Sequence, residues 1–271
     1  MKVAAIQITS KPDVEENLRQ VEMYIRNAAA EGATYIVTPE NTELMIDNRR
    51  EHLDKHYPQD THPGVALFSS LAKELGVYLQ AGSFQILDSD MQKLRNRSFL
   101  FNPDGSLQTT YDKIHLFDVD LPTGESHRES KTIIAGDRLG MGWVADVPVG
   151  LAICYDLRFP HLFRDMAKKG AKIITVPAAF TVPTGQAHWH ILLRARAIET
   201  GAFIVAPAQT GQHTETRFTY GHSLIIDPWG SVLVEAETDI ASYIYADLDL
   251  SLVERARRSI PSLQHDRKYL I

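Results

Sequence analysis

Apolar positions along the chain follow two alternating patterns, one typical of strands and one typical of helices. Continuous apolar runs at 3–8 and 35–38 predict two buried strands. Between them, apolar residues recur at helical spacing over 14–31, and Gly32 follows directly, as glycine often does at a helix end. This part of the chain therefore predicts a strand, a helix and a second strand in succession.

The same alternation continues along the chain, but hairpins are mixed with the strand–helix units. Helices are expected at 63–75, 160–169 and 186–200, and single strands at 77–81, 173–176, 203–206 and 243–247. Hairpins are expected from 98–101 with 107–111, from 143–147 with 150–154 and from 222–226 with 232–235. This mixture predicts an α/β fold with two mixed sheets packed face to face between helix layers. Without a linker or low-complexity tract, we expect a four-layer α-β-β-α sandwich forming a single domain over residues 1–271.

Composition and charge narrow the classes of partner. The chain has 271 residues, of which 44% are hydrophobic, enough for a sizeable core. The formal net charge is -6 and the densest basic run, 255–258, is short, so neither nucleic acid nor an anionic membrane is expected as a partner. The sequence shows no signal-peptide pattern and no apolar stretch near the roughly 20 residues of a membrane span. A cytoplasmic location is the expectation.

Cys154 is the only cysteine, which excludes an internal disulfide and a CxxC metal site. An apolar strand is expected to end at this residue, with a tight turn after it and a helix from Pro160. This is the layout of a nucleophile elbow, which presents its side chain at the edge of a sheet. A helix N-terminus nearby would lower the pKa of the thiol and favour the reactive thiolate. The competing interpretation is that a lone cysteine is simply a small buried hydrophobe.

A carboxylate and an ammonium group follow two other apolar strands. Glu40 comes just after the strand at 35–38, and Lys113 stands at the far end of a hairpin strand. Each residue alone is more often a loop or strand-end charge at the surface. If the strands are neighbours, however, Glu40, Lys113 and Cys154 converge at one sheet edge, a set suited to acyl transfer.

The sequence resembles the nitrilase superfamily of carbon–nitrogen hydrolases over nearly its whole length. Three short motifs in family order carry the resemblance: Thr-Pro-Glu at 38–40, Tyr-Asp-Lys at 111–113 and Gly-Leu-Ala-Ile-Cys at 150–154. Segments at 154–160, 185–199, 208–211 and 220–230 are similar to the branch of deaminated glutathione amidases. The branch commonly has Glu at the position of His161, and the segment 41–46 after Glu40 is also unusual. Both departures are expected near the mouth of the pocket.

The resemblance implies hydrolysis of a small-molecule amide without a metal or other cofactor. Glu40 would take the proton from Cys154, and the thiolate would attack the amide carbonyl. Lys113 and the backbone N–H of Tyr155 would stabilise the oxyanion. Loss of ammonia or a small amine would leave a thioester, which water activated by Glu40 would hydrolyse. The family also tends to pair through its sandwiches, so a homodimer or higher homo-oligomer is expected.

The resemblance also implies a second glutamate in the pocket, and Glu129 fits best by position, with Glu125 as the alternative. Independently of that, the sequence suggests a substrate-binding set. Arg158 with Phe180 and Thr181 would line the part of the pocket that holds an acidic substrate. Arginine is the natural partner for a free carboxylate.

Several alternatives stay open at this point. Within enzymes, the substrate could instead be an ω-amide of a keto acid, a carbamoyl compound or a nitrile. Outside catalysis, the chain could be an interaction protein on the same fold or a redox-sensing thiol protein. His188 and His190 stand at i and i+2 of a predicted helix, so they do not share a face, and we expect no metal site between them.

Overall fold

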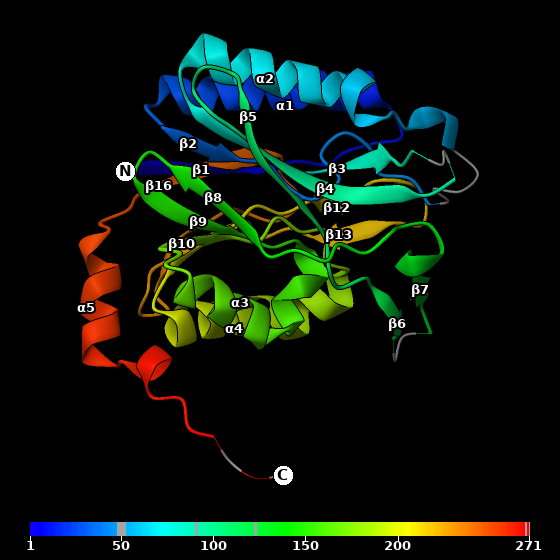
Figure 1. The fold of residues 1–271 in the computed structure, drawn as a ribbon. Coiled ribbons are helices and arrows are strands. Elements are labelled where there is room, and N and C mark those ends of the chain that lie inside the picture. The colour runs from blue at the N-terminus through cyan, green and yellow to red at the C-terminus, as the bar shows by residue number, and fades with distance from the viewer. Residues whose placement is uncertain (48–52, 90–91, 122–123, 269, 271) are drawn as a thin grey trace.

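The computed structural model describes residues 1–47, 53–89, 92–121, 124–268 and 270, and it shows four layers (Figure 1). Helices α1 (Val14–Ala30) and α2 (Pro63–Leu75) cover one six-stranded sheet. A second six-stranded sheet packs against the first, and α3 (Pro160–Lys168) and α4 (Val182–Thr200) cover its outer face. Helix α5 (Ser251–Ser259) lies beside these layers (Figure 1). The predicted α-β-β-α sandwich with two mixed sheets is therefore confirmed.

The first sheet has the strand order β16-β1-β2-β3-β4-β5. These strands are β16 (Ser242–Asp247), β1 (Lys2–Gln7), β2 (Tyr35–Val37), β3 (Tyr78–Leu87), β4 (Leu94–Phe101) and β5 (Leu107–Asp112). Strands β1, β2 and β3 pair in parallel, whereas β3, β4 and β5 form an antiparallel meander. Strands β1, β2, β3 and β5 thus run in the same direction and end at the same edge of the sheet.

The second sheet has the order β15-β14-β11-β10-β9-β8. These strands are β15 (Val232–Glu235), β14 (Leu224–Ile226), β11 (Phe203–Ala206), β10 (Ile173–Thr175), β9 (Val147–Leu151) and β8 (Gly140–Val144). Its three central strands, β9, β10 and β11, are parallel. Two short antiparallel ribbons lie outside the sheets: β6 (Asp118–Asp120) with β7 (Ser126–Arg128), and β12 (Thr210–Gln212) with β13 (Phe218–Tyr220).

The core explains the continuous apolar runs of the sequence. One hydrophobic cluster fills the space between the two sheets and continues under α3 and α4, and another lies between the first sheet and α1 and α2. Most strands are covered on both faces, so side chains on both faces are apolar. The sequence of such a strand is therefore a continuous apolar run and does not alternate with polar residues. Helix ends follow local rules as well, since Gly76 and Gly201 take the left-handed backbone conformation after α2 and α4.

Several details of the sequence-based prediction were wrong, among them the lengths of β3 and β4, which are longer than expected, and α5, which was not expected. The second hairpin lies three residues earlier than expected, as β8 with β9, because its turn is at Ala145, whose backbone is left-handed (φ 52°). Strand β9 therefore ends at Leu151 and not at Cys154. Helix α4 begins four residues early, with Pro183 in its first turn. The ribbons β6–β7 and β12–β13 are too short and too polar to give a strand signal.

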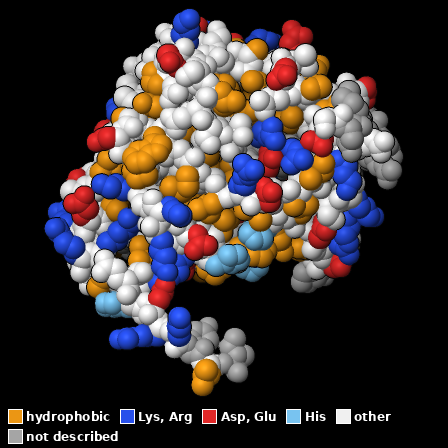
Figure 2. Space-filling model, in the orientation of Figure 1, with side chains coloured by type: hydrophobic (Ala, Val, Ile, Leu, Met, Phe, Trp, Pro, Cys, Tyr) orange, Lys and Arg blue, Asp and Glu red, His pale blue; other side chains and the backbone are white. Residues whose placement is uncertain are grey.

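The surface carries charges of both signs. Figure 2 shows Lys and Arg side chains interspersed with Asp and Glu over the face it presents. Among the described residues, none of the helices combines the length and apolar character needed to cross a membrane.

Candidate active site

Glu40 reaches the interior because the chain crosses over β3 directly after β2. A Cβ atom at Gly82 would lie 1.9 Å from the carbonyl oxygen of Thr38, so only glycine permits this crossing. The N–H of Gly82 donates to the Thr38 hydroxyl (3.1 Å), and the N–H of Ser83 donates to the carbonyl oxygen of Pro39 (3.2 Å). The crossing carries Glu40 from β2 towards β4, where its side chain is 3% exposed.

Lys113 lies at the centre of a buried cluster. Its Nζ donates to Glu40 Oε1 (2.9 Å) and to both oxygens of Glu129 (2.9 and 3.2 Å). Asn96, in β4, donates from Nδ2 to Glu40 Oε1 (2.8 Å) and holds the backbone N–H of Lys113 through its own carbonyl (2.9 Å). The ammonium group occupies the place that a metal ion would take between two carboxylates.

The structure separates the two glutamates that the sequence left open. Glu129 is 8% exposed, contacts Lys113 and accepts a hydrogen bond from the backbone N–H of Phe117 (2.7 Å). Glu125 is exposed just before β7, and among the described residues its carboxylate approaches His127, at 3.4 Å. Glu129 therefore belongs to the buried cluster and Glu125 does not.

Cys154 joins this cluster from the second sheet. It follows β9, opens a 3-10 turn (Cys154–Arg158) and has a left-handed backbone with φ 49°. Such a conformation is rare for a residue with a side chain and is typical of a nucleophile elbow. The thiol lies within electrostatic reach of the Glu40 carboxyl group, of the Lys113 ammonium group and of the backbone N–H of Ala179. Glu40, Lys113, Glu129 and Cys154 thus meet at one place.

The electrostatics of the thiol differ from the sequence-based prediction. Burial raises the pKa of Cys154 well above its ordinary value, and the negative charge of Glu40 raises it further, against the opposing effect of Lys113. Burial alone would lower the pKa of Lys113, but Glu129 and Glu40 outweigh it, and the pKa of the ammonium group is raised. The resting site therefore holds a neutral thiol beside a charged lysine. The prediction that a helix N-terminus lowers the pKa of Cys154 and keeps it as a thiolate is therefore wrong.

Asp156 supports the turn that carries Cys154. This fully buried carboxylate accepts hydrogen bonds from the Tyr111 hydroxyl (2.7 Å) and from the backbone N–H groups of Ile153 (2.9 Å) and His115 (3.0 Å). Its partners come from both sheets, since Tyr111 lies in β5. The left-handed turn is thereby anchored to the strand that leads to Lys113.

Among the residues expected to bind substrate, Arg158 and Phe180 lie next to each other. The guanidinium group of Arg158 stands 5.8 Å from the ring centre of Tyr155 and 5.5 Å from that of Phe180. It contacts His188 (3.3 Å) and forms no ion pair with a described residue. Thr181, the N-cap of α4, shares a hydrogen bond with Thr184 (2.8 Å). Among the described residues, the N–H of Tyr155 has no acceptor outside its own 3-10 turn.

The two unusual segments lie in different surroundings. The segment 41–46 is buried, and Asn41 within it has a left-handed backbone (φ 54°). His161 is exposed and stands edge-on to the ring of Phe159 (6.2 Å). Sequence reasoning also missed Asn96. Its strand also carries Arg95, Arg97 and Ser98, so an asparagine among them gives no distinct signal in the sequence.

Comparison with known proteins identifies the class of protein. The family model described as carbon-nitrogen hydrolase matches residues 2–258. The chain belongs to this family, and it is a hydrolase that acts on carbon–nitrogen bonds other than peptide bonds.

Individual relatives agree with this assignment. A protein of Synechocystis sp. named deaminated glutathione amidase is 40% identical over 265 residues, covering 97% of this chain and 96% of the relative. The crystal structure of the C. elegans NitFhit protein superimposes with a TM-score of 0.91 at 34% identity, and this chain spans 65% of that longer chain. Saccharomyces cerevisiae Nit3, a member of branch 10 of the nitrilase superfamily, has a TM-score of 0.87, 30% identity and coverage of 98% and 96%.

Proposed function

We propose that Cys154 is the nucleophile, Glu40 the proton-transfer base and Lys113 the stabilising cation of an amide hydrolase. The observation that carries this proposal is that the Cys154 thiol lies within electrostatic reach of both Glu40 and Lys113, which are themselves joined by a hydrogen bond of 2.9 Å. Because the pKa of the thiol is raised, the thiolate has to be generated during the reaction, and Glu40 is the base within reach.

The reaction then runs in two halves. Glu40 removes the proton from Cys154 as the sulfur attacks the amide carbonyl, and the oxyanion receives hydrogen bonds from Lys113 and from the N–H of Tyr155. Glu40 returns the proton to the leaving amine, and a thioester remains on Cys154. In the second half, Glu40 takes a proton from water, the resulting hydroxide attacks the thioester, and the proton returns to the sulfur as the acid leaves. Glu129 acts as a positioning residue that holds Lys113.

The substrate proposed is deaminated glutathione, the compound in the name of the Synechocystis relative. Its amide joins a 2-oxo acid to cysteinylglycine, so hydrolysis releases 2-oxoglutarate and that dipeptide. The substrate carries free carboxylates, and Arg158 offers a guanidinium group without an ion-pair partner among the described residues. A charge-assisted contact of this kind contributes about 1.5–3 kcal/mol.

The test is to incubate purified protein with deaminated glutathione and to measure both 2-oxoglutarate and cysteinylglycine, with Cys154→Ala as the control. Equal amounts of both products from the wild type, and none from the folded variant, would support the nucleophile and the substrate together. Ammonia from 2-oxoglutaramate in preference to this reaction would favour the ω-amidase alternative. Carbamoyl compounds and nitriles complete the panel, compared by kcat/KM.

The two alternatives outside catalysis have less support. A non-catalytic interaction protein has no need to bury Lys113 with two carboxylates, which is costly unless every charge is paired. A redox-sensing thiol works best as an accessible thiolate, whereas Cys154 is buried and its pKa is raised. A homo-oligomer and a cytoplasmic location stay predictions, to be checked by light scattering and by cell fractionation.

A further inference from the structure

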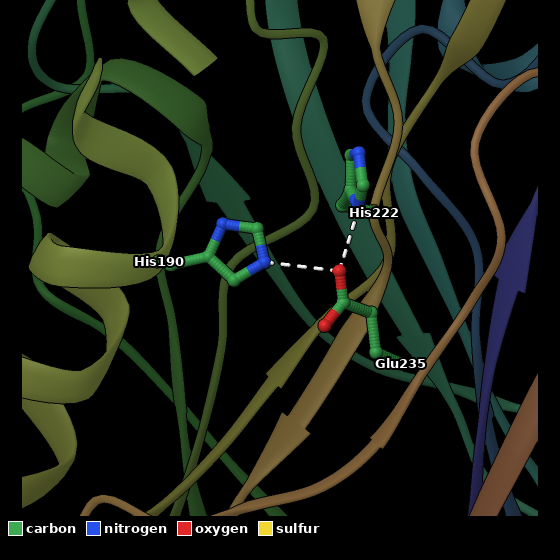
Figure 3. Close-up of side chains that lie close together, drawn as sticks. All are labelled: His190, His222 and Glu235. Carbon is green, nitrogen blue, oxygen red and sulfur yellow. Dashed lines mark hydrogen bonds and ion pairs between the residues drawn. The ribbon is translucent and has the colours of Figure 1, made fainter. Parts of the chain in front are cut away.

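A second group of chemically capable side chains lies apart from the buried cluster (Figure 3). His190 projects from α4, His222 from the connection between β13 and β14, and Glu235 from the end of β15. Nε2 of His190 lies 3.0 Å from Glu235 Oε1, and Nδ1 of His222 lies 2.6 Å from the same oxygen. The three ligand atoms all fall within 4.8 Å of one another.

The spacing of these atoms is close to that around a small divalent cation. Zn²⁺ binds imidazole nitrogen and carboxylate oxygen at about 2.0–2.2 Å, so tetrahedral ligand atoms stand about 3.3–3.5 Å apart. Glu235 Oε1 is closer than this to both ring nitrogens, and the three atoms span up to 4.8 Å, so binding needs the carboxylate to withdraw and the two imidazoles to approach each other by about 1 Å. All three side chains are partly exposed, which gives them room to change rotamer.

The backbone at His222 gives a second observation at the same place. His222 has a left-handed backbone with φ 56°, which is uncommon for a residue with a side chain. Strain of this kind is found most often at functional sites, and here it turns the imidazole towards Glu235.

We propose that His190, His222 and Glu235 form a binding site for Zn²⁺ or a similar divalent transition-metal ion. Two imidazoles and one carboxylate favour such ions over Mg²⁺ and Ca²⁺, which prefer oxygen ligands throughout. Three protein ligands leave one position for water or another ligand. The metal replaces the hydrogen bonds that now join the three side chains.

The three ligands come from α4, from the connection that precedes β14 and from β15. A bound ion would therefore link a helix to the edge of the second sheet. Trp189, next to His190, donates from Nε1 to the carbonyl oxygen of His222 (2.8 Å), and its ring packs on Phe180 with ring centres 4.8 Å apart. Phe180 in turn lies under Arg158, the residue proposed to bind the substrate carboxylate. A bound ion would therefore hold α4 against the edge of the second sheet, one residue away from Trp189, which packs on Phe180.

The experiment is a titration of chelator-treated protein with Co²⁺, followed by visible absorption and then by displacement with Zn²⁺. It is done in the Cys154→Ala background, so that the thiol cannot supply a ligand. We expect one Co²⁺ per chain with the intense visible bands of four-coordinate cobalt. Glu235→Gln and His222→Asn should each weaken the affinity at least tenfold, and asparagine tolerates the left-handed backbone.

A matched control comes from the same helix. His188→Ala removes another histidine of α4, two residues from His190 and outside the cluster, and should leave cobalt affinity within twofold of the parent. Thermal unfolding gives a second measurement, because an ion that binds the folded state raises Tm in the parent protein and not in Glu235→Gln. Weak, non-saturating binding, or equal affinity in the parent and in both cluster variants, would overturn the proposal.

Discussion

Replacing Glu129 by glutamine isolates the contribution of the second carboxylate to the buried cluster. Glu129 holds Lys113 with bonds of 2.9 and 3.2 Å while accepting the backbone N–H of Phe117 at 2.7 Å. Glutamine keeps the shape but offers one acceptor oxygen, so either Lys113 or Phe117 loses its partner. One charge-assisted hydrogen bond corresponds to about 1.5–3 kcal/mol. If that loss falls on the transition state, kcat decreases about 10- to 150-fold.

The assay is steady-state hydrolysis of deaminated glutathione by the wild type, Glu129→Gln and the matched control Glu125→Gln. Glu125 precedes Glu129 by four residues but is exposed, so its variant should stay within about twofold of the wild type. A positioning role predicts that kcat falls and KM changes little. A folded Glu129→Gln enzyme with wild-type kcat would refute the reasoning, and equal losses in both variants would show that the effect is not specific to the buried carboxylate.

Three further predictions follow from the structure. Arg158→Ala should raise KM for the carboxylate-bearing substrate about 10- to 150-fold with little change in kcat, and an unchanged KM would remove Arg158 from the substrate site. Glu40→Gln removes a negative charge that raises the pKa of Cys154, so the midpoint of the pH profile for iodoacetamide alkylation should shift downward, and an upward shift would contradict the assigned electrostatics. Burial lowers the pKa of His213 from 6.5 to about 4, so the unfolded chain binds more protons between these values. Stability should therefore fall by about 3 kcal/mol as the pH drops from 7 to 4, and urea unfolding of His213→Gln should lack this component.

Residues at strand ends were the part of the site that the sequence could predict. Glu40, Lys113 and Cys154 each follow an apolar strand, and that pattern depends only on local sequence. The prediction that they converge because their strands are neighbours was wrong in detail. β2 and β5 are separated by β3 and β4, and Cys154 comes from the other sheet. The crossing over Gly82 that brings Glu40 across β3 depends on a close backbone approach, which no periodicity reveals.

The state of the thiol could not be predicted for a similar reason. Sequence order places Cys154 near a helix start, which on its own favours a thiolate. The structure adds burial, with Cys154 only 8% exposed, and a carboxylate from a residue 114 positions earlier in the chain, and these long-range effects outweigh the local one. Asn96 was missed because its role depends on Glu40 and Lys113 being on either side of it.

The buried cluster is divided between the two sheets. Catalytic activity therefore depends on how the two sheets pack against each other. Glu40, Asn96 and Lys113 are carried by the first sheet, and Cys154 is carried by the second. The thiol keeps its base only while the hydrophobic cluster shared by the two sheets holds them together. In a denaturant titration, turnover should disappear as soon as the sheets lose their mutual register, ahead of the loss of helical circular dichroism.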